Sequence, residues 1–181
     1  MKMKQSNNNV FAVLQAKLNS IAGSQGKVGW FENAKYEDGT PVAGVAMLQE
    51  YGSAKMNIPP RSFMRITVAE KQKNWGELAA SGANAILKGN ETPASVLAKL
   101  TIQAQNDVSE KISSITAPPL SQITLGARKY RQEGKKVTGA TIGQIARELK
   151  AGTLDVSGVS TKPLEDTGYM SATLTHIVEK I

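Results

Sequence analysis

The sequence contains no cysteine and a single histidine, His176, among its 181 residues. Without cysteine there are no disulfides, thiolate metal sites or cysteine nucleophiles, and one histidine excludes metal sites that need two. No apolar run approaches the roughly 20 residues that span a membrane, and no hydrophobic signal core follows the polar start MKMKQSNNN. We therefore expect a protein that needs no metal, no cofactor and no membrane.

Groups arranged for catalysis are also scarce. Glu165 and Asp166 are adjacent carboxylates, but sequence neighbours on an extended chain point to opposite sides and are poorly placed for paired acid–base work. Asp166 is expected to cap the turn at Thr167-Gly168. His176 is expected to lie in a strand and to be hydrogen-bonded to a neighbouring side chain. No glycine-rich segment shows the pattern of a phosphate-binding loop. The sequence thus indicates a protein that is not an enzyme, and a hydrolase using these carboxylates is the least favoured alternative.

Positive charge exceeds negative charge, with 22 Lys and Arg against 15 Asp and Glu. Much of the excess lies in one short segment, made up of Arg128, Lys129, Arg131, Lys135 and Lys136. These residues suit a solvated helix end, where basic groups complement the helix dipole, or contact with nucleic acid or an acidic protein surface. Only Tyr130 is interleaved among them, whereas single-strand binders carry several stacking aromatics. An acidic protein surface is therefore favoured over DNA.

The apolar spacing predicts an α+β fold, in which a long helical hairpin packs with a small, mainly antiparallel sheet and extra helices flank both ends. The hairpin covers 62–117, with Thr92 and Pro93 opening its second helix and Pro118 ending it. Strands at 27–31 and 174–181 are expected to pair, and further helices at 8–22, 41–51, 121–131 and 142–150. We predict a single domain over 1–181, with a flexible N-terminus at 1–9 and an inserted arm at 132–161.

One stretch, from Pro41 to Arg65, is unusual: PVAGVAMLQEYGSAKMNIPPRSFMR. Thr40 is expected to cap its helix, Pro41 to occupy the first position and Gly52 to stop it. The Pro59-Pro60 pair then holds the backbone extended. The segment is either a rigid loop, with a core phenylalanine and arginines that are solvated or paired with Glu50, or an edge presented to a neighbouring subunit. The candidate interface residues are Ile58, Pro59, Pro60, Arg61, Phe63 and Arg65.

This stretch resembles the tail-completion, or head–tail joining, proteins of long-tailed bacteriophages, which carry a segment of the form VA..QE.G....IPPRPF.R. The stretches KVGWF at 27–31, PPLS at 118–121 and KPLEDTGYM at 162–170 follow in the family's order. Two departures are Ser62, where the family has a proline, and a longer connection at 132–161.

The resemblance implies a structural virion protein, made in the host cytoplasm, that forms a ring joining the capsid connector to the tail tube. A sixfold ring is expected, because it must match an axially symmetric partner. Its partners would be itself, neighbouring neck and tail proteins and, in the channel, the genomic DNA. A tail terminator, a collar or minor tail protein and a non-catalytic DNA-binding module remain alternatives.

Overall fold

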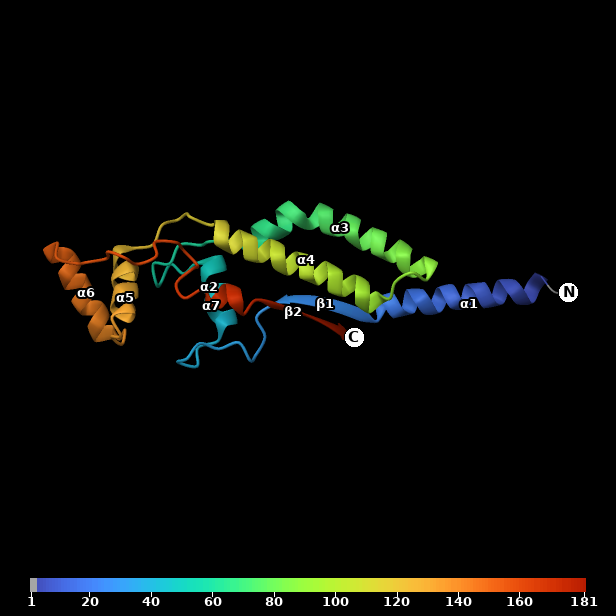
Figure 1. Cartoon of the computed structure of the whole chain (residues 1–181), viewed down its shortest axis with the longest axis horizontal. Helices are drawn as coiled ribbons and strands as arrows, with labels where there is room; N and C mark the ends of the chain where they lie inside the picture. The colour runs from blue at the N-terminus through green and yellow to red at the C-terminus, as the bar shows by residue number, and fades with distance from the viewer. Residues whose placement is uncertain (1–2) are drawn as a thin grey trace.

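The computed structural model describes residues 3–181, and within them seven helices accompany one antiparallel sheet of two strands. The molecule is elongated, with the helical hairpin in the middle, two helices at one end and the N-terminal helix at the other (Figure 1). The α+β architecture with a long hairpin is therefore confirmed. The elements are α1 (Met3–Ala22), β1 (Ser24–Gly29), α2 (Val42–Tyr51), α3 (Met64–Lys88), α4 (Pro93–Ser114), α5 (Gln122–Gln132), α6 (Gly139–Ala151), α7 (Tyr169–Ala172) and β2 (Thr175–Lys180).

The hairpin is formed by α3 and α4, which begin and end close to the expected positions. The side chain of Thr92 accepts a hydrogen bond from the backbone N–H of Ser95, and Gly89 ends α3 in the left-handed conformation. Near the start of α3, the apolar Ile66 is exposed and the polar Thr67 is buried. Residues four apart share a helix face, so a buried Phe63 brings Thr67 inside, where its hydroxyl donates to the Phe63 carbonyl oxygen at 2.6 Å.

The two strands join the N-terminal and C-terminal parts of the chain. Ser24 is opposite Lys180 and Gly29 is opposite Thr175, so the predicted pairing is correct, although β1 begins and ends earlier than 27–31. The ribbon packs against α4. There the Nδ1 atom of His176, in β2, lies 2.6 Å from Oε1 of Gln105 on α4, so the histidine has the neighbouring partner that was expected.

The main hydrophobic core lies where the base of the hairpin meets α2 and α7. The Trp30 and Phe63 rings meet edge to face, with centroids 5.8 Å apart, and the Trp30 indole N–H donates to the Met170 carbonyl oxygen at 2.7 Å. The core therefore draws on five separate segments of the chain. Its buried members are Val42, Ala46, Phe63, Val108, Ile112, Met170 and Leu174.

A second, smaller core lies between α5 and α6 and contains the residues predicted to form an inserted arm. Thr138 and Thr141 make a capping box at the start of α6, and Gly152 ends it in the left-handed conformation. Ile145 of α6 is completely buried. The segment 132–161 is thus a packed helix followed by an irregular return. This core is built from Ala127, Tyr130 and Ile145 with Ile123, Val137, Ile142 and Leu154 around them.

The N-terminal helix α1 begins at Met3 rather than at the expected residue 8. Most of the segment 1–9, which was predicted to be flexible, is therefore helical. The remaining part of that prediction, Met1 and Lys2, lies outside the described residues. Figure 1 shows α1 extending past the tip of the hairpin. Within residues 3–181, none of the helices combines the length and apolar character that crossing a membrane requires.

Candidate protein interface

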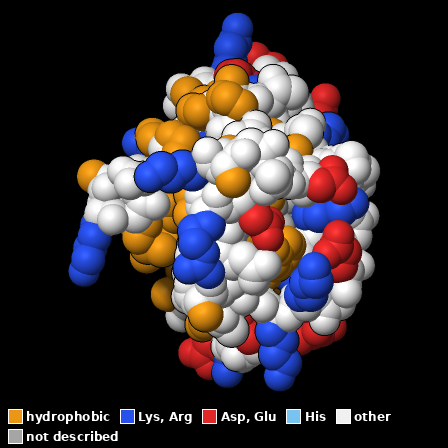
Figure 2. Space-filling view, turned by 90° about the vertical axis from the view of Figure 1, so that its left-hand side faces the viewer, with side chains coloured by type: hydrophobic (Ala, Val, Ile, Leu, Met, Phe, Trp, Pro, Cys, Tyr) orange, Lys and Arg blue, Asp and Glu red, His pale blue; other side chains and the backbone are white. Residues whose placement is uncertain are grey.

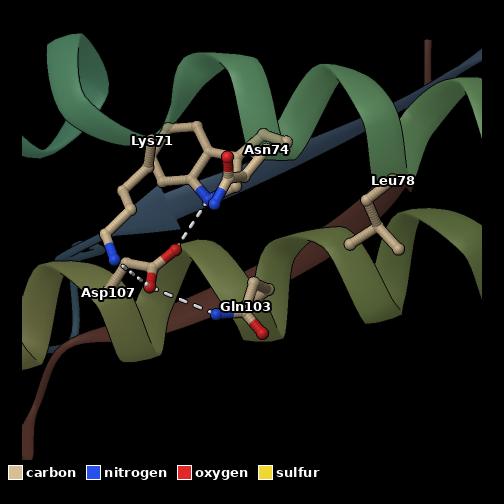
Figure 3. Close-up of a pocket in the computed structure, with 6 residues that line it drawn as sticks. Lys71, Asn74, Leu78, Gln103 and Asp107 are labelled. Atoms are coloured by element: carbon tan, nitrogen blue, oxygen red, sulfur yellow. Dashed lines mark hydrogen bonds and ion pairs between the residues drawn. The ribbon is translucent and has the colours of Figure 1, made fainter.

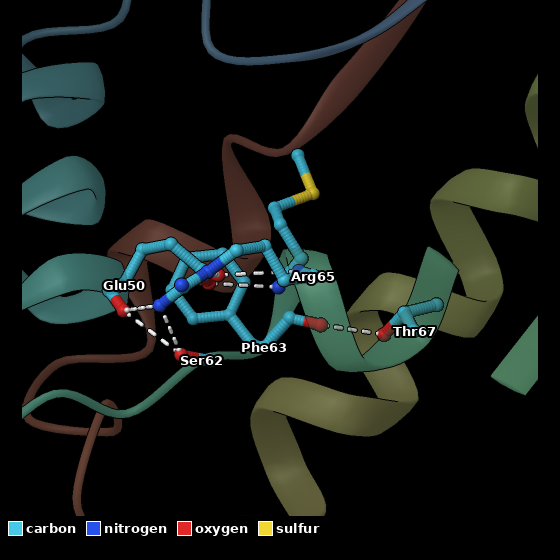
Figure 4. Close-up of polar contacts among 6 residues, drawn as sticks. Glu50, Ser62, Phe63, Arg65 and Thr67 are labelled. Carbon is cyan, nitrogen blue, oxygen red and sulfur yellow. Dashed lines mark hydrogen bonds and ion pairs between the residues drawn. The ribbon is translucent and has the colours of Figure 1, made fainter. Parts of the chain in front are cut away.

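The segment with the unusual signature is organised around the buried carboxylate of Glu50, near the C-terminal end of α2. Its two oxygens accept hydrogen bonds from the backbone N–H groups of Met64 and Arg65, at 2.8 and 3.1 Å (Figure 4). These N–H groups open α3 and would otherwise lack partners. Glu50 therefore caps α3 from another helix, and α3 has no side-chain cap of its own. Thr40 was expected to cap α2, and this prediction is wrong, because Pro41 occupies the cap position and makes no side-chain hydrogen bond.

Arg65 completes this arrangement from the surface. Its Nε atom lies 2.9 Å from Oε1 of Glu50, one terminal nitrogen donates to the Glu50 carbonyl oxygen at 3.0 Å, and its guanidinium stacks over the Tyr51 ring at 4.6 Å. Ser62, where the family pattern has a proline, donates to the same carbonyl at 3.0 Å. Arg65 is thus held in a fixed orientation with one face open to solvent.

Arg61 is buried, with only 4% of its surface exposed. It donates from Nε to the Pro118 carbonyl oxygen at 2.9 Å, from one terminal nitrogen to the Pro119 carbonyl oxygen at 3.1 Å and from the other to Oε1 of Gln49 at 3.0 Å. Burial lowers the pKa of the guanidinium, and the positive charge of Arg128 lowers it further. Arg61 therefore ties α2 to the connection between α4 and α5. Its side chain, like that of the buried Phe63, is not presented to a neighbour.

Large apolar side chains are exposed on the outside of this segment. Met47 and Tyr51, four residues apart on α2, are 63% and 62% exposed, and Met56 in the following loop is 60% exposed. The loop is closed by a bridge between Ser53 and Ile58, whose backbone atoms bond at 2.8 and 2.9 Å. We call the surface formed by Met47, Tyr51, Met56 and Arg65 the junction surface. Of the predicted interface residues in this segment, Arg65 lies within it, while Ile58, Pro59 and Pro60 form the loop that supports it.

The basic residues of α5 mostly hold the return segment that follows α6. Arg128 is buried and donates from one terminal nitrogen to the carbonyl oxygens of Ser160 and Lys162, at 2.7 and 2.9 Å. Its Nε lies 3.4 Å from a carboxylate oxygen of Asp166, which also pairs with Arg131. Asp166 therefore anchors α5. The expectation that it caps the turn at Thr167-Gly168 is wrong. Burial is the main influence on Arg128 and lowers the pKa of its guanidinium.

The three lysines of the basic segment differ in their surroundings. Lys129 donates to the Ser157 carbonyl oxygen at 3.0 Å and lies 3.5 Å from Asp155. Lys135 pairs with Glu133 at 2.8 Å and lies over the Tyr130 ring. Lys136 is exposed beside it. On the end of the molecule drawn in Figure 2, lysine and arginine side chains are interspersed with acidic ones. Most of the basic cluster therefore serves contacts within the chain.

A polar cluster between α3 and α4 lines a cavity of about 240 Å³ (Figure 3). The buried carboxylate of Asp107 accepts hydrogen bonds from Nε1 of Trp75 at 2.7 Å and Nε2 of Gln103 at 3.1 Å, and Nζ of Lys71 lies 3.6 Å away. Its polar groups bind one another across the hairpin. Within residues 3–181, no group of three or more histidine and carboxylate side chains is placed to hold a metal ion.

The exposed apolar side chains of the junction surface were not among the residues predicted from the sequence. Met47 and Tyr51 lie within the signature, and their spacing of four residues was the available signal.

Comparisons of the chain with protein-family models, with curated proteins and with solved structures find no match.

Proposed function

We propose that this protein is a structural virion component at the head–tail junction of a tailed bacteriophage, made in the host cytoplasm. In this role it assembles into a ring that joins the capsid connector to the tail tube. It acts through contacts with copies of itself and with neighbouring neck and tail proteins, and breaks no bond. The proposal rests on the resemblance of the signature segment to tail-completion proteins and on the form that this segment takes.

The observation that carries the proposal is the junction surface. Met47, Tyr51 and Met56 are exposed, and the Tyr51 ring lies under the guanidinium of Arg65, which is already oriented by Glu50. Aromatic, methionine and arginine side chains are the types enriched in protein interfaces, and a side chain ordered in advance loses less entropy on docking. The buried part of the signature therefore supports a rigid platform, and its exposed part supplies the contact.

In a ring, each copy contacts the next one head to tail, so it uses one surface toward the copy before it and a different surface toward the copy after it. The elongated shape in Figure 1 separates the end formed by α5 and α6 from the end at α1. The junction surface lies beside the base of the hairpin, where it can meet the next copy while both ends stay free for other proteins. A sixfold ring is part of this proposal.

The double variant M47E/M56E tests the proposal. It places charges on the junction surface without touching the buried network. I102E is a control, since Ile102 is also exposed but lies in the middle of α4, outside the junction surface. In phage whose copy of this gene is deleted, supplying wild-type protein or I102E should restore tailed particles under the electron microscope. M47E/M56E should leave separate heads and tails. Normal tailed, infectious particles from the deletion itself would overturn the proposed function.

The oligomeric state of the purified proteins gives a second measurement. Native mass spectrometry should show a ring for wild-type protein and I102E, and monomers for M47E/M56E. A ring that persists in M47E/M56E would show that the junction surface does not join the subunits.

A further inference from the structure

The helix α1 carries an apolar stripe that the rest of the chain leaves largely uncovered. Phe11, Leu14, Leu18 and Ile21 follow one another at intervals of three, four and three residues, the spacing of a coiled-coil seam. Phe11 and Leu18 are 68% and 52% exposed, and Leu14 is also exposed. A row of this kind on one helix face is the typical contact of one helix with another.

The described contacts of α1 with the body come from its C-terminal half. Nζ of Lys17 donates to the Leu87 carbonyl oxygen at 2.9 Å, and Ile21 is half-buried. Beyond this point α1 extends past the hairpin tip (Figure 1). Most helical stability in proteins comes from packing of an apolar face. A second helix on the stripe would cover Phe11, Leu14 and Leu18, which the described part of the chain leaves exposed.

Charge distinguishes among the helices that would fit. The only charged residues of α1 are Lys4 and Lys17, and Lys88 ends the neighbouring α3. Two α1 helices side by side would therefore repel each other. None of the other described helices has an excess of exposed acidic residues: α5 contains basic residues only, the single acidic residue of α2, Glu50, is buried, and in α3, α4 and α6 the basic residues equal or outnumber the acidic ones. The complement of α1 is thus an acidic helix from a different protein.

We propose that α1 is a docking helix that binds an acidic amphipathic helix of another protein along Phe11, Leu14 and Leu18. A membrane surface suits α1 less well. Helices that lie on membranes are rich in Lys and Arg on the polar face, whereas this face of α1 carries Gln15, Asn19 and Ser20. The inference stands apart from the proposed function, because it uses neither the signature segment nor the junction surface.

The test uses the full chain and two synthetic peptides. Both have leucine and isoleucine at the seam positions of three heptads, one with glutamate at the flanking positions and the other with lysine. Fluorescence anisotropy should show binding of the acidic peptide at least about tenfold tighter than binding of the basic one. The variant L14Q/L18Q should weaken binding of the acidic peptide about a hundredfold. V13Q is the matched control, since Val13 is 55% exposed but lies outside the stripe, and it should bind normally.

Other results would overturn the proposal. Equal binding of the two peptides, or equal binding by wild type and L14Q/L18Q, would remove the basis for an acidic helix on this stripe. Concentration-dependent self-association that L14Q/L18Q abolishes would identify a second copy as the occupant. Binding to vesicles of anionic phospholipid that the same variant abolishes would identify a membrane. Circular dichroism of both variants checks that each is folded.

Discussion

At the scale of single residues, the same kind of side chain serves two purposes within five positions of the chain. Arg61 is buried and binds two carbonyl oxygens and an amide oxygen. Arg65 is half-exposed and pairs with a carboxylate. Sequence alone made them equivalent candidates for a subunit interface. The structure distinguishes them because Arg61 is covered by a distant part of the chain, at Pro118 and Pro119. No local sequence pattern predicts that contact.

The different burial of the two arginines predicts different effects on stability. Replacing Arg61 by alanine removes three hydrogen bonds from a buried site and should lower the free energy of unfolding by about 2–4 kcal/mol. Replacing Arg65 by alanine should lower it by about 1 kcal/mol or less, because the Arg65 side chain is half-exposed and the Glu50 carboxylate keeps its two backbone N–H partners. Urea unfolding followed by circular dichroism measures both. Equal losses in R61A and R65A would contradict the role assigned to Arg61.

At the scale of elements, close packing of α3 on α4 depends on a glycine. A Cβ atom added to Gly82 would overlap the Val96 side chain, whereas one added to Gly76, on the same helix, meets nothing within 4 Å. Alanine is otherwise favoured over glycine in a helix interior by about 0.5–1 kcal/mol. The two glycines therefore have opposite roles, which neither the sequence nor their shared helix reveals.

Alanine substitutions at the two glycines should change stability in opposite directions. G76A should raise the free energy of unfolding by about 0.5–1 kcal/mol. G82A should lower it by about 1–3 kcal/mol, the usual effect of overpacking. Combining G82A with V96A should recover part of the loss, because the overlapping side chain is then removed. Thermal and urea unfolding provide the values, and a stabilised G82A would show that α3 and α4 can separate without loss.

The elements that the sequence predicted well are those whose ends are encoded locally. Thr92 with Pro93, Ser121 and Gly152 mark helix ends through bonds to residues three or four positions away, and the apolar spacing located the hairpin. Features that depend on distant partners could not be predicted. Glu50 caps α3 from another helix, and α7 is a single turn between the core and β2, too short to leave a periodic pattern.

At the scale of the whole molecule, contacts of Arg61 and Arg128 link the regions of the two hydrophobic cores. The smaller core, between α5 and α6, also has hydrogen bonds of its own. The Tyr130 hydroxyl donates to Oε1 of Glu148 at 2.6 Å, and Nε2 of Gln144 donates to the same oxygen at 2.9 Å. The hydrogen bond from Tyr130, followed by that from Gln144, lowers the pKa of the Glu148 carboxyl. The ionised form of Glu148 thus stabilises the packing of α5 on α6.

A lowered pKa in the folded state predicts a loss of stability in acid. The contribution of Glu148 should be complete above the unfolded-state pKa of about 4.3 and should disappear as the pH falls through the lower folded-state value. E148Q should therefore be less stable than wild type at pH 6 and should approach it near pH 3. Thermal unfolding across this range measures the difference, with E77Q, which removes a glutamate of α3, as the control. A gap between wild type and E148Q that stays constant with pH would contradict this account.

The pairing of β1 with β2 has a consequence for the order in which the molecule is made. Gln25 and Glu179, which bond across the ribbon at 2.6 Å, are 154 residues apart in the chain. Residue contacts across so long a separation form late, because the intervening chain must first be ordered. During translation, β1 must wait until β2 has been made before the two strands can pair. A chain truncated before β2 therefore lacks the strand pairing that lies next to the base of α1.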